Sequence, residues 1–197
     1  MSRRVAIYLT HPEVAIDPAV PVPDWGLSQV GRARHVALND RLGPVGSVWS
    51  SAERKAIDGA QILAEARGLV PQVRDALHEN DRSATGYLPP DEFEATADAF
   101  FATPDISVRG WERAVDAQAR VIAALRAIVA EASAGDIAVV AHGGIGALTR
   151  AHVAGAPISR VHDQPPGSGG GNALAIGLPE EGSGWTLLRD WQPIDRW

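Results

Sequence analysis

Two histidines stand where buried strands are expected to end. His11 closes the run AIYLTH and precedes a proline, while His142 follows DIAVVA and precedes two glycines. A strand that stops at such a residue directs a polar side chain towards a site. At His142 the glycines let backbone N–H groups approach a ligand, and the N-terminus of a helix there favours an anion.

Two further polar groups occupy comparable positions. Ser51 ends the segment VGSVWSS, and Glu79 comes shortly after VPQVRDAL. Ligands collect at the carboxyl ends of parallel strands, so we expect both residues to lie near the two histidines. A carboxyl group at this edge can donate or accept a proton. Taken alone, Glu79 is more simply explained as a surface acid.

Several motifs compete for the segment HGGIGALTR. A dinucleotide-binding fingerprint would need glycine where Thr149 stands, and a P-loop would need Gly-Lys-Ser/Thr. An esterase loop can begin His-Gly-Gly, but the chain has no Gly-x-Ser-x-Gly nucleophile elbow. Neither histidine has the His-x-x-x-His spacing or acidic cluster of a metal site nearby. A tight turn in which His142 only caps the strand explains this segment alone equally well.

Cations are also available at this edge. Arg54 and Lys55 stand in the first turn of an expected helix, where cations oppose the helix dipole unless an anion is bound. Arg82 follows Glu79 by three residues. Each of these cations alone is more simply explained as a solvated surface charge. The other histidines lack matching partners, and we assign no role to His35, His78, His152 and His162.

Apolar runs and helical periodicity alternate along the chain. Strands are expected over residues 5–9, 45–51, 70–77, 136–141, 172–178 and 185–191, the last two antiparallel. Helices are expected from the N-cap Ser28 to Arg41 and over 52–68, 91–102, 111–132 and 147–153. This alternation predicts an α/β fold, a three-layer α/β/α sandwich with a mostly parallel central sheet. We expect a single domain over residues 1–197 with a cap-like insertion at about 80–110.

Composition restricts the class of protein. The chain has 197 residues, a formal net charge of -6, no cysteine and no run of Lys or Arg longer than two. These values argue against nucleic-acid binding and exclude disulfides, a thiolate nucleophile and a cysteine-based zinc site. The N-terminal apolar run is too short for a signal peptide, and no segment approaches the ~20 apolar residues of a membrane span. We expect a cytoplasmic protein without membrane binding, and the sequence carries no signal for an oligomeric state.

The order of these segments resembles that of the histidine phosphatase superfamily, also called phosphoglycerate mutase-like. IYLTHPEV matches its strand ending in Arg-His-Gly-Glu, and LSQVGRARHVAL is similar to its Leu-Thr-x-x-Gly-x-x-Gln-Ala helix. SSAERKAIDGAQIL resembles its Ser-Ser-x-x-x-Arg-Ala helix, and IAVVAHGG its second-histidine strand. The resemblance extends over nearly the whole chain.

The resemblance implies a phosphohistidine mechanism with no metal or other cofactor. His11 would attack the phosphorus in line with the ester oxygen, and Glu79 would protonate the leaving group and later activate water. His142 and the Gly143 N–H would stabilise the equatorial oxygens. In the family, the region that corresponds to the insertion caps the site.

The chain departs from the family pattern around His11 and at a second cation. Thr10 stands where the family has arginine, and Pro12 replaces a glycine. Lys55 aligns with a second phosphate-binding arginine, and lysine cannot form the bidentate fork of a guanidinium. Three arginines are candidates to compensate: Arg54, Arg82 and Arg109.

The sequence therefore predicts a phosphatase, a metal-independent phosphomonoester hydrolase that acts on a small phosphorylated substrate and binds inorganic phosphate. The alternative is a degenerate phosphatase-like protein that holds a phosphorylated ligand or partner without turnover. A phosphoglycerate-type mutase fits less well, because nothing indicates a phosphoglycerate site. The expected catalytic residues are His11, Glu79 and His142, with Thr10, Arg54, Lys55, Arg82 and Gly143 at the phosphate.

Overall fold

A six-stranded sheet forms the centre of the structure, a computed structural model in which residues 4–132, 134–167, 169–179 and 184–197 are described. The strand order is β3-β2-β4-β1-β5-β6. The strands are β1 (Val5–Thr10), β2 (Ser47–Ser50), β3 (Gln72–Val73), β4 (Ile137–Ala141), β5 (Asn172–Gly177) and β6 (Thr186–Pro193).

The strand directions bring four carboxyl ends to one edge of the sheet. β1 and β2 both pair in parallel with β4, and β3 pairs in parallel with β2. β5 is antiparallel to both β1 and β6, as expected for the two closing strands. The chain therefore leaves the sheet on the same side after Thr10, Ser50, Val73 and Ala141.

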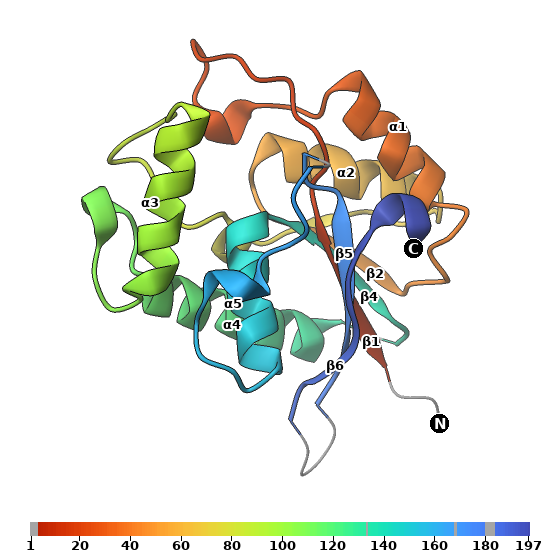
Figure 1. Ribbon diagram of the computed structural model, residues 1–197. Coiled ribbons are helices and arrows are strands. Elements are labelled where there is room, and N and C mark those ends of the chain that lie inside the picture. Colours follow the sequence, from red (N-terminus) through yellow and green to blue (C-terminus); the bar gives the residue numbers. More distant parts are fainter. Residues whose placement is uncertain (1–3, 133, 168, 180–183) are drawn as a thin grey trace.

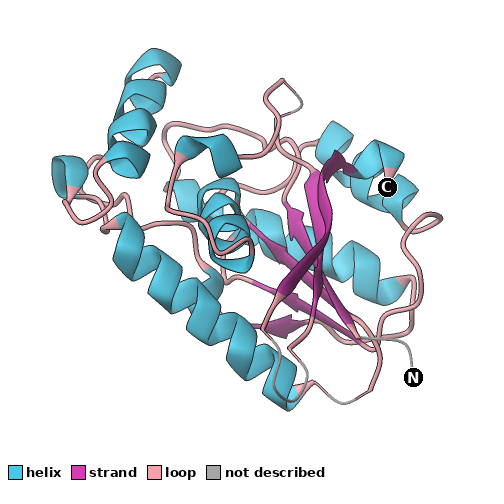
Figure 2. Cartoon of the chain, turned by 60° about the horizontal axis from the view of Figure 1, so that its bottom comes forward, coloured by secondary structure: helices cyan, strands magenta, loops and turns pink. Residues whose placement is uncertain are grey.

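Helices cover both faces of this sheet. They are α1 (Gln29–Leu38), α2 (Arg54–Glu65), α3 (Pro90–Ala102), α4 (Ala114–Glu131) and α5 (Gly143–Val153). α1 and α2 lie on one face, and α4 and α5 lie on the other (Figures 1 and 2). Each face has its own buried cluster, with Leu38 and Leu63 on the first and Val121 and Ile145 on the second. This is the predicted three-layer α/β/α sandwich.

The segment around α3 lies outside these layers. α3 stands away from the sheet, at the left of Figure 1. Its Phe100 and Phe101 are buried in a separate cluster with Trp111 and with Leu148 of α5. The predicted insertion is therefore attached to the sandwich through α5 and the start of α4. No helix in the described part of the chain has the length and apolar character to cross a membrane.

Most element predictions agree with the structure, and three are corrected. Ser28 caps α1 as predicted, because its Oγ accepts a hydrogen bond from the Gly31 N–H at 3.0 Å. α1 ends at Leu38, earlier than the predicted Arg41. The strand predicted over residues 70–77 was wrong beyond β3, since residues 75–77 form a 3-10 helix. The helix predicted from Ala147 begins at Gly143.

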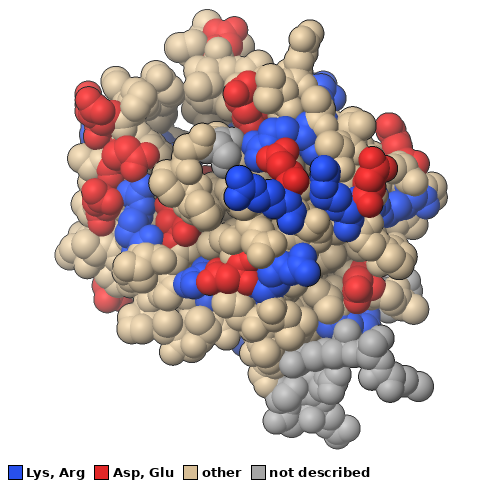
Figure 3. Space-filling model, turned by 45° about the vertical axis from the view of Figure 1, so that its right-hand side comes forward, with Lys and Arg blue, Asp and Glu red and all other residues tan. Residues whose placement is uncertain are grey.

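The charged surface is mixed in sign. On the face shown in Figure 3, basic and acidic side chains lie side by side rather than in separate patches. Several arginines are paired with carboxylates, such as Arg34 with Asp195 at 2.7 Å and Arg150 with Asp190 at 2.5 Å. Such neighbouring opposite charges largely cancel each other's field at a distance.

Candidate active site

His11 is fixed at the end of β1 by its own backbone. Its N–H donates to the Ala141 carbonyl at 3.0 Å, and its carbonyl accepts from the Gly171 N–H at 3.0 Å. The ring Nδ1 lies 3.0 Å from the Pro12 carbonyl, which can only accept, so Nδ1 carries the proton and Nε2 has the lone pair. Burial, and then His142, lower the pKa of His11 to about 3. The ring is therefore neutral near pH 7, with a free nucleophilic nitrogen.

His142 is fully buried directly after β4, at the N-cap of α5. Its carbonyl accepts a hydrogen bond from the Tyr8 hydroxyl at 2.8 Å. Its Nε2 lies 2.7 Å from Ser51 Oγ and 3.2 Å from Glu53 Oε1, whereas its buried Nδ1 has no partner among the described residues. The ring centroids of His11 and His142 are 5.3 Å apart, with planes at 68°. The structure thus brings the two predicted histidines together.

Glu79 lies across the start of α5. Its Oε2 accepts from the Gly144 N–H at 3.0 Å, and its Oε1 accepts from the N–H groups of Ile145 and Asn80, both at 3.0 Å. A Cβ at residue 144 would lie 2.7 Å from Glu79 Oε1, so only glycine allows this approach. The carboxylate occupies two N-terminal donors of α5, and the Gly143 N–H is left without a partner among the described residues.

Lys55 is buried and paired, and the sequence prediction missed its partner. Its Nζ lies 2.5 Å from Glu53 Oε2 and 2.9 Å from the Val22 carbonyl. Glu53 is the N-cap residue of α2, and its Oε1 also accepts from the Glu79 N–H at 2.9 Å. Burial opposes ionisation of Glu53, but His142, Lys55 and the hydrogen bonds outweigh it and lower the pKa to about 2. A carboxyl group two residues before a lysine was the only available sequence signal.

The Thr10 hydroxyl is hydrogen-bonded to Gln164, a second residue that the sequence prediction missed. The hydroxyl donates to Gln164 Oε1 at 2.6 Å and accepts from the Asn172 N–H at 2.9 Å. Asn172 Nδ2 also donates to Gln164 Oε1, at 2.9 Å. The amide Nε2 of Gln164 is left beside the start of α5, where a Cβ on Gly143 would lie 2.5 Å from it. No sequence motif connects Gln164 with Thr10, because they lie 154 residues apart.

The remaining predicted cations lie in different environments. Arg54 is 62% exposed and pairs with Asp58 at 2.9 Å, so it belongs to the surface of α2. The Arg82 guanidinium lies 5.0 Å from the Phe93 ring centroid and 5.7 Å from that of Trp111, without a carboxylate partner among the described residues. Burial lowers the pKa of His142 against the effect of two carboxylates, and the Arg82 charge contributes to this lowering. Arg109 instead contacts two α3 residues, Glu92 and Thr96.

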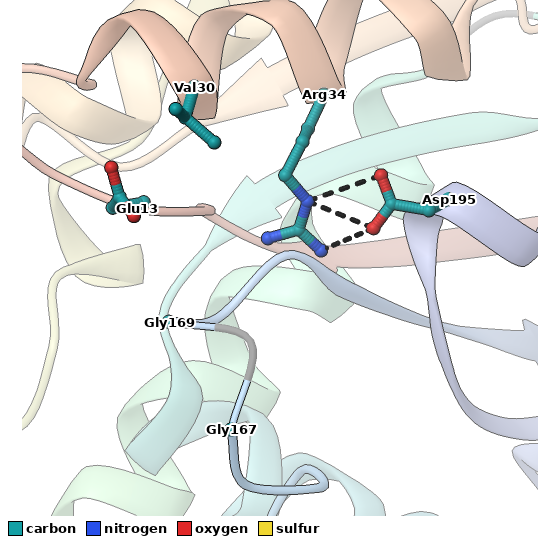
Figure 4. A pocket seen from close by; sticks show the side chains of 6 residues that line it. All are labelled: Glu13, Val30, Arg34, Gly167, Gly169 and Asp195. Carbon is teal, nitrogen blue, oxygen red and sulfur yellow. Dashed lines mark hydrogen bonds and ion pairs between the residues drawn. The ribbon is translucent and has the colours of Figure 1, made fainter.

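Two features outside this cluster bear on other kinds of site. The described residues contain no group of three or more His, Asp or Glu side chains that could hold a metal ion. An open depression of about 410 Å³ is lined by Arg34 and Asp195, which bind each other, and by Glu13, Val30, Gly167 and Gly169 (Figure 4). It shares no residue with the cluster around His11 and His142.

The chain belongs to the histidine phosphatase superfamily, branch 1, whose sequence profile matches residues 18–189. The match begins after His11, so the unusual Thr-His-Pro segment lies outside it. A mycobacterial glucosyl-3-phosphoglycerate phosphatase solved with inorganic phosphate is 25% identical over 98% of this chain and 99% of that one, with a TM-score of 0.79. YhfR of Bacillus stearothermophilus is 21% identical over 97% and 99% of the two chains, with a TM-score of 0.80. None of the curated proteins compared with the chain matches it.

Proposed function

We propose that the protein hydrolyses phosphomonoesters through a phosphohistidine formed on His11. The observation that carries this proposal is the pairing of the half-buried His11 imidazole with the fully buried His142 imidazole. His11 has a free Nε2, and His142, 5.3 Å away between ring centroids, has an unpartnered Nδ1. A buried polar atom without a partner is costly in a folded protein, and a ligand group would satisfy it.

Neutral donors surround the position proposed for the phosphoryl group. The Gly143 N–H at the start of α5 and the Gln164 Nε2 beside it are without partners among the described residues, whereas Gln164 Oε1 is engaged by Thr10 and Asn172. We assign both unpartnered groups, together with His142, to the phosphoryl oxygens. Thr10 then acts by orienting Gln164 rather than by touching the phosphate, since its hydroxyl is already engaged. Arg82, on the insertion that we expect to cap the site, is the cation proposed to approach the substrate.

The proposed reaction has two steps. The Nε2 of His11 forms a bond to phosphorus while the bond from phosphorus to the leaving oxygen breaks, and the Glu79 carboxyl group protonates that oxygen. Water then attacks the phosphorus while its bond to His11 Nε2 breaks, Glu79 takes a proton from the water, and inorganic phosphate leaves with His11 neutral and Glu79 protonated again. Hydrogen-bond donors around the transferring group stabilise the charge on its oxygens in both steps.

Small phosphorylated metabolites are the proposed substrate class. The similar mycobacterial structure is that of a glucosyl-3-phosphoglycerate phosphatase, and it was solved with inorganic phosphate. That structure supports a phosphate site within this fold. The residues outside the phosphate position, on the insertion around α3, would then contact the rest of the substrate.

A phosphate-binding protein without turnover is the second candidate. Lys55 is neutralised by Glu53, and the Thr10 hydroxyl has no free hydrogen. The site therefore offers less positive charge than the family pattern implies. The presence of an acid, Glu79, within the site favours the enzyme, because binding alone does not need a proton donor.

Turnover of para-nitrophenyl phosphate tests the proposal. The wild-type protein is expected to hydrolyse it after treatment with a chelator, and His11→Ala is expected to lower the rate at least a thousandfold. Wild-type protein quenched during turnover should carry an alkali-stable, acid-labile phosphoryl group that His11→Ala lacks. The matched control is His152→Ala, on α5, with unchanged activity. Phosphate binding without turnover of any phosphomonoester would favour the second candidate.

A further inference from the structure

The Glu53 carboxylate is positioned to act on the phosphate site through another residue. Its two oxygens accept from Lys55 Nζ at 2.5 Å and the Glu79 N–H at 2.9 Å, and Oε1 lies 3.2 Å from His142 Nε2. Its side chain is only 10% exposed. Lys55 and the Glu79 backbone thus hold the carboxylate against one nitrogen of the His142 ring.

The groups at Nε2 bias which nitrogen of His142 carries the proton. Nε2 lies 2.7 Å from Ser51 Oγ, a hydroxyl that can donate or accept, and 3.2 Å from Glu53 Oε1, which can only accept, so the Glu53 charge favours the tautomer with the proton on Nε2. In a neutral imidazole Nδ1 is then a bare lone pair. Nδ1 is also the nitrogen without a partner, and the ring lies against His11. A bare lone pair repels a phosphoryl oxygen, so in this tautomer His142 binds an anion through Nδ1 only after it has taken up a second proton.

The groups around His142 keep it neutral until an anion arrives. Burial lowers its pKa most, the carboxylates of Glu53 and Glu79 oppose this, and the cations Lys55 and Arg82 reinforce it. Its other neighbour, His11, is neutral near pH 7. A dianion at Nδ1 would reverse this balance, because the imidazolium would then have a negative group on both nitrogens.

We propose that Glu53 is a positioning residue that couples phosphate binding to the uptake of one proton by His142. The bound anion is held by the Nδ1–H of an imidazolium, while the Nε2–H faces Ser51 Oγ and the Glu53 carboxylate. The proton comes from solvent, and it supplies a positive charge in a site where Thr10 and the paired Lys55 supply none. This inference deepens the proposed function and rests on it.

Calorimetric titration of inorganic phosphate at pH 8, in buffers of different ionisation enthalpy, tests the coupling. Phosphate is largely the dianion at this pH, so its own proton does not contribute. The wild type is expected to take up about one proton for each phosphate bound. Glu53→Gln keeps the size of the side chain but removes its charge, so uptake should fall towards zero and affinity at least tenfold. Glu53→Asp is expected to retain part of both effects.

A matched control is Glu65→Gln, the same substitution at an exposed position of α2, which should leave uptake and affinity unchanged. Binding by the wild type without proton uptake would overturn the inference. So would tighter binding by Glu53→Gln, since Glu53 would then compete with phosphate for Lys55. The titration needs no turnover, so it tests the proton coupling independently of the proposed hydrolase activity. Catalysis without proton uptake removes only this inference, and proton uptake without catalysis removes only the hydrolase.

Discussion

Two histidines are completely buried in different regions of the molecule, and the groups around their ring nitrogens differ. At the carboxyl edge of the sheet, His142 has Ser51 and Glu53 on one nitrogen and a second histidine beside its unpartnered one. Between α1 and α2, His35 is equally buried, and neither of its nitrogens has a partner in the described part of the chain. Its ring lies so close to Gly59 that a Cβ there would be 2.5 Å from Nε2.

The comparison shows that neither burial nor an unpartnered nitrogen is enough to identify a site. Ser51 and Glu53 contact Nε2 of His142, and its Nδ1 is left without a partner among the described residues, in a ring that lies beside His11. His35 has no such contacts among the described residues, and its polar atoms only reduce stability, because they have lost water without gaining a hydrogen bond. We propose that the first arrangement serves a ligand and that the second serves packing.

The largest expected effect comes from a substitution of Glu79 in the candidate active site. Glu79→Gln removes the proposed acid, so hydrolysis of an alkyl phosphate, whose leaving oxygen needs a proton, should fall at least a hundredfold. The first step with para-nitrophenyl phosphate should fall less than about tenfold, because nitrophenolate leaves without protonation. Rapid-quench measurement of both steps checks this, with Glu65→Gln as the control. Equal losses with both substrates would show that Glu79 acts only as the cap of α5.

An intermediate effect is expected from His35→Leu, through stability and its pH dependence. Burial, and then Arg34, lower the pKa of His35 from 6.5 to about 4, so the unfolded chain binds a proton more readily than the folded protein. The free energy of unfolding should therefore fall by about 3 kcal/mol between pH 6.5 and pH 4 through this residue. His35→Leu should remove this fall in the free energy of unfolding and leave turnover at pH 7 unchanged.

Chemical denaturation of both proteins at several pH values between 7 and 4 measures this difference. The pKa of His11 is also lowered, to about 3, so it contributes a similar fall to both proteins and cancels in the comparison. Parallel pH dependence of the two unfolding free energies would contradict the assignment of His35 to packing. Loss of turnover by the folded variant would connect the α1–α2 interface with the active site.

The smallest expected effect is from Arg54→Ala, at the surface of α2. Because Arg54 is largely exposed and its partner Asp58 is also held by Arg32 at 2.6 Å, stability should change by less than about 0.5 kcal/mol. Phosphate affinity should change less than twofold. Lys55→Met is the matched substitution at the next residue, and we expect it to weaken phosphate binding at least tenfold, since it releases Glu53. Equal losses in the two variants would place Arg54 at the phosphate.

Much of the fold could be predicted from local sequence. The run that forms β4 is buried at every residue, and Ser28 caps α1 through a hydrogen bond three residues along the chain. The length of the third strand was overestimated. Both residues of β3 are exposed at an edge of the sheet, and its pairing with β2 extends over two residues only. Apolar residues such as Val70 in that segment are exposed, so they did not indicate a buried strand.

The sequence by itself determined that His11 and His142 follow β1 and β4, because apolar periodicity and helix-start residues act within a few neighbours. Tertiary structure alone decided what surrounds them. Gln164 reaches Thr10 from 154 residues away, and Glu53 turns towards both Lys55 and His142. Such partners depend on which strands lie side by side and which carboxylate satisfies which donor. Those are properties of the folded chain, since no local pattern encodes the distance between segments far apart in sequence.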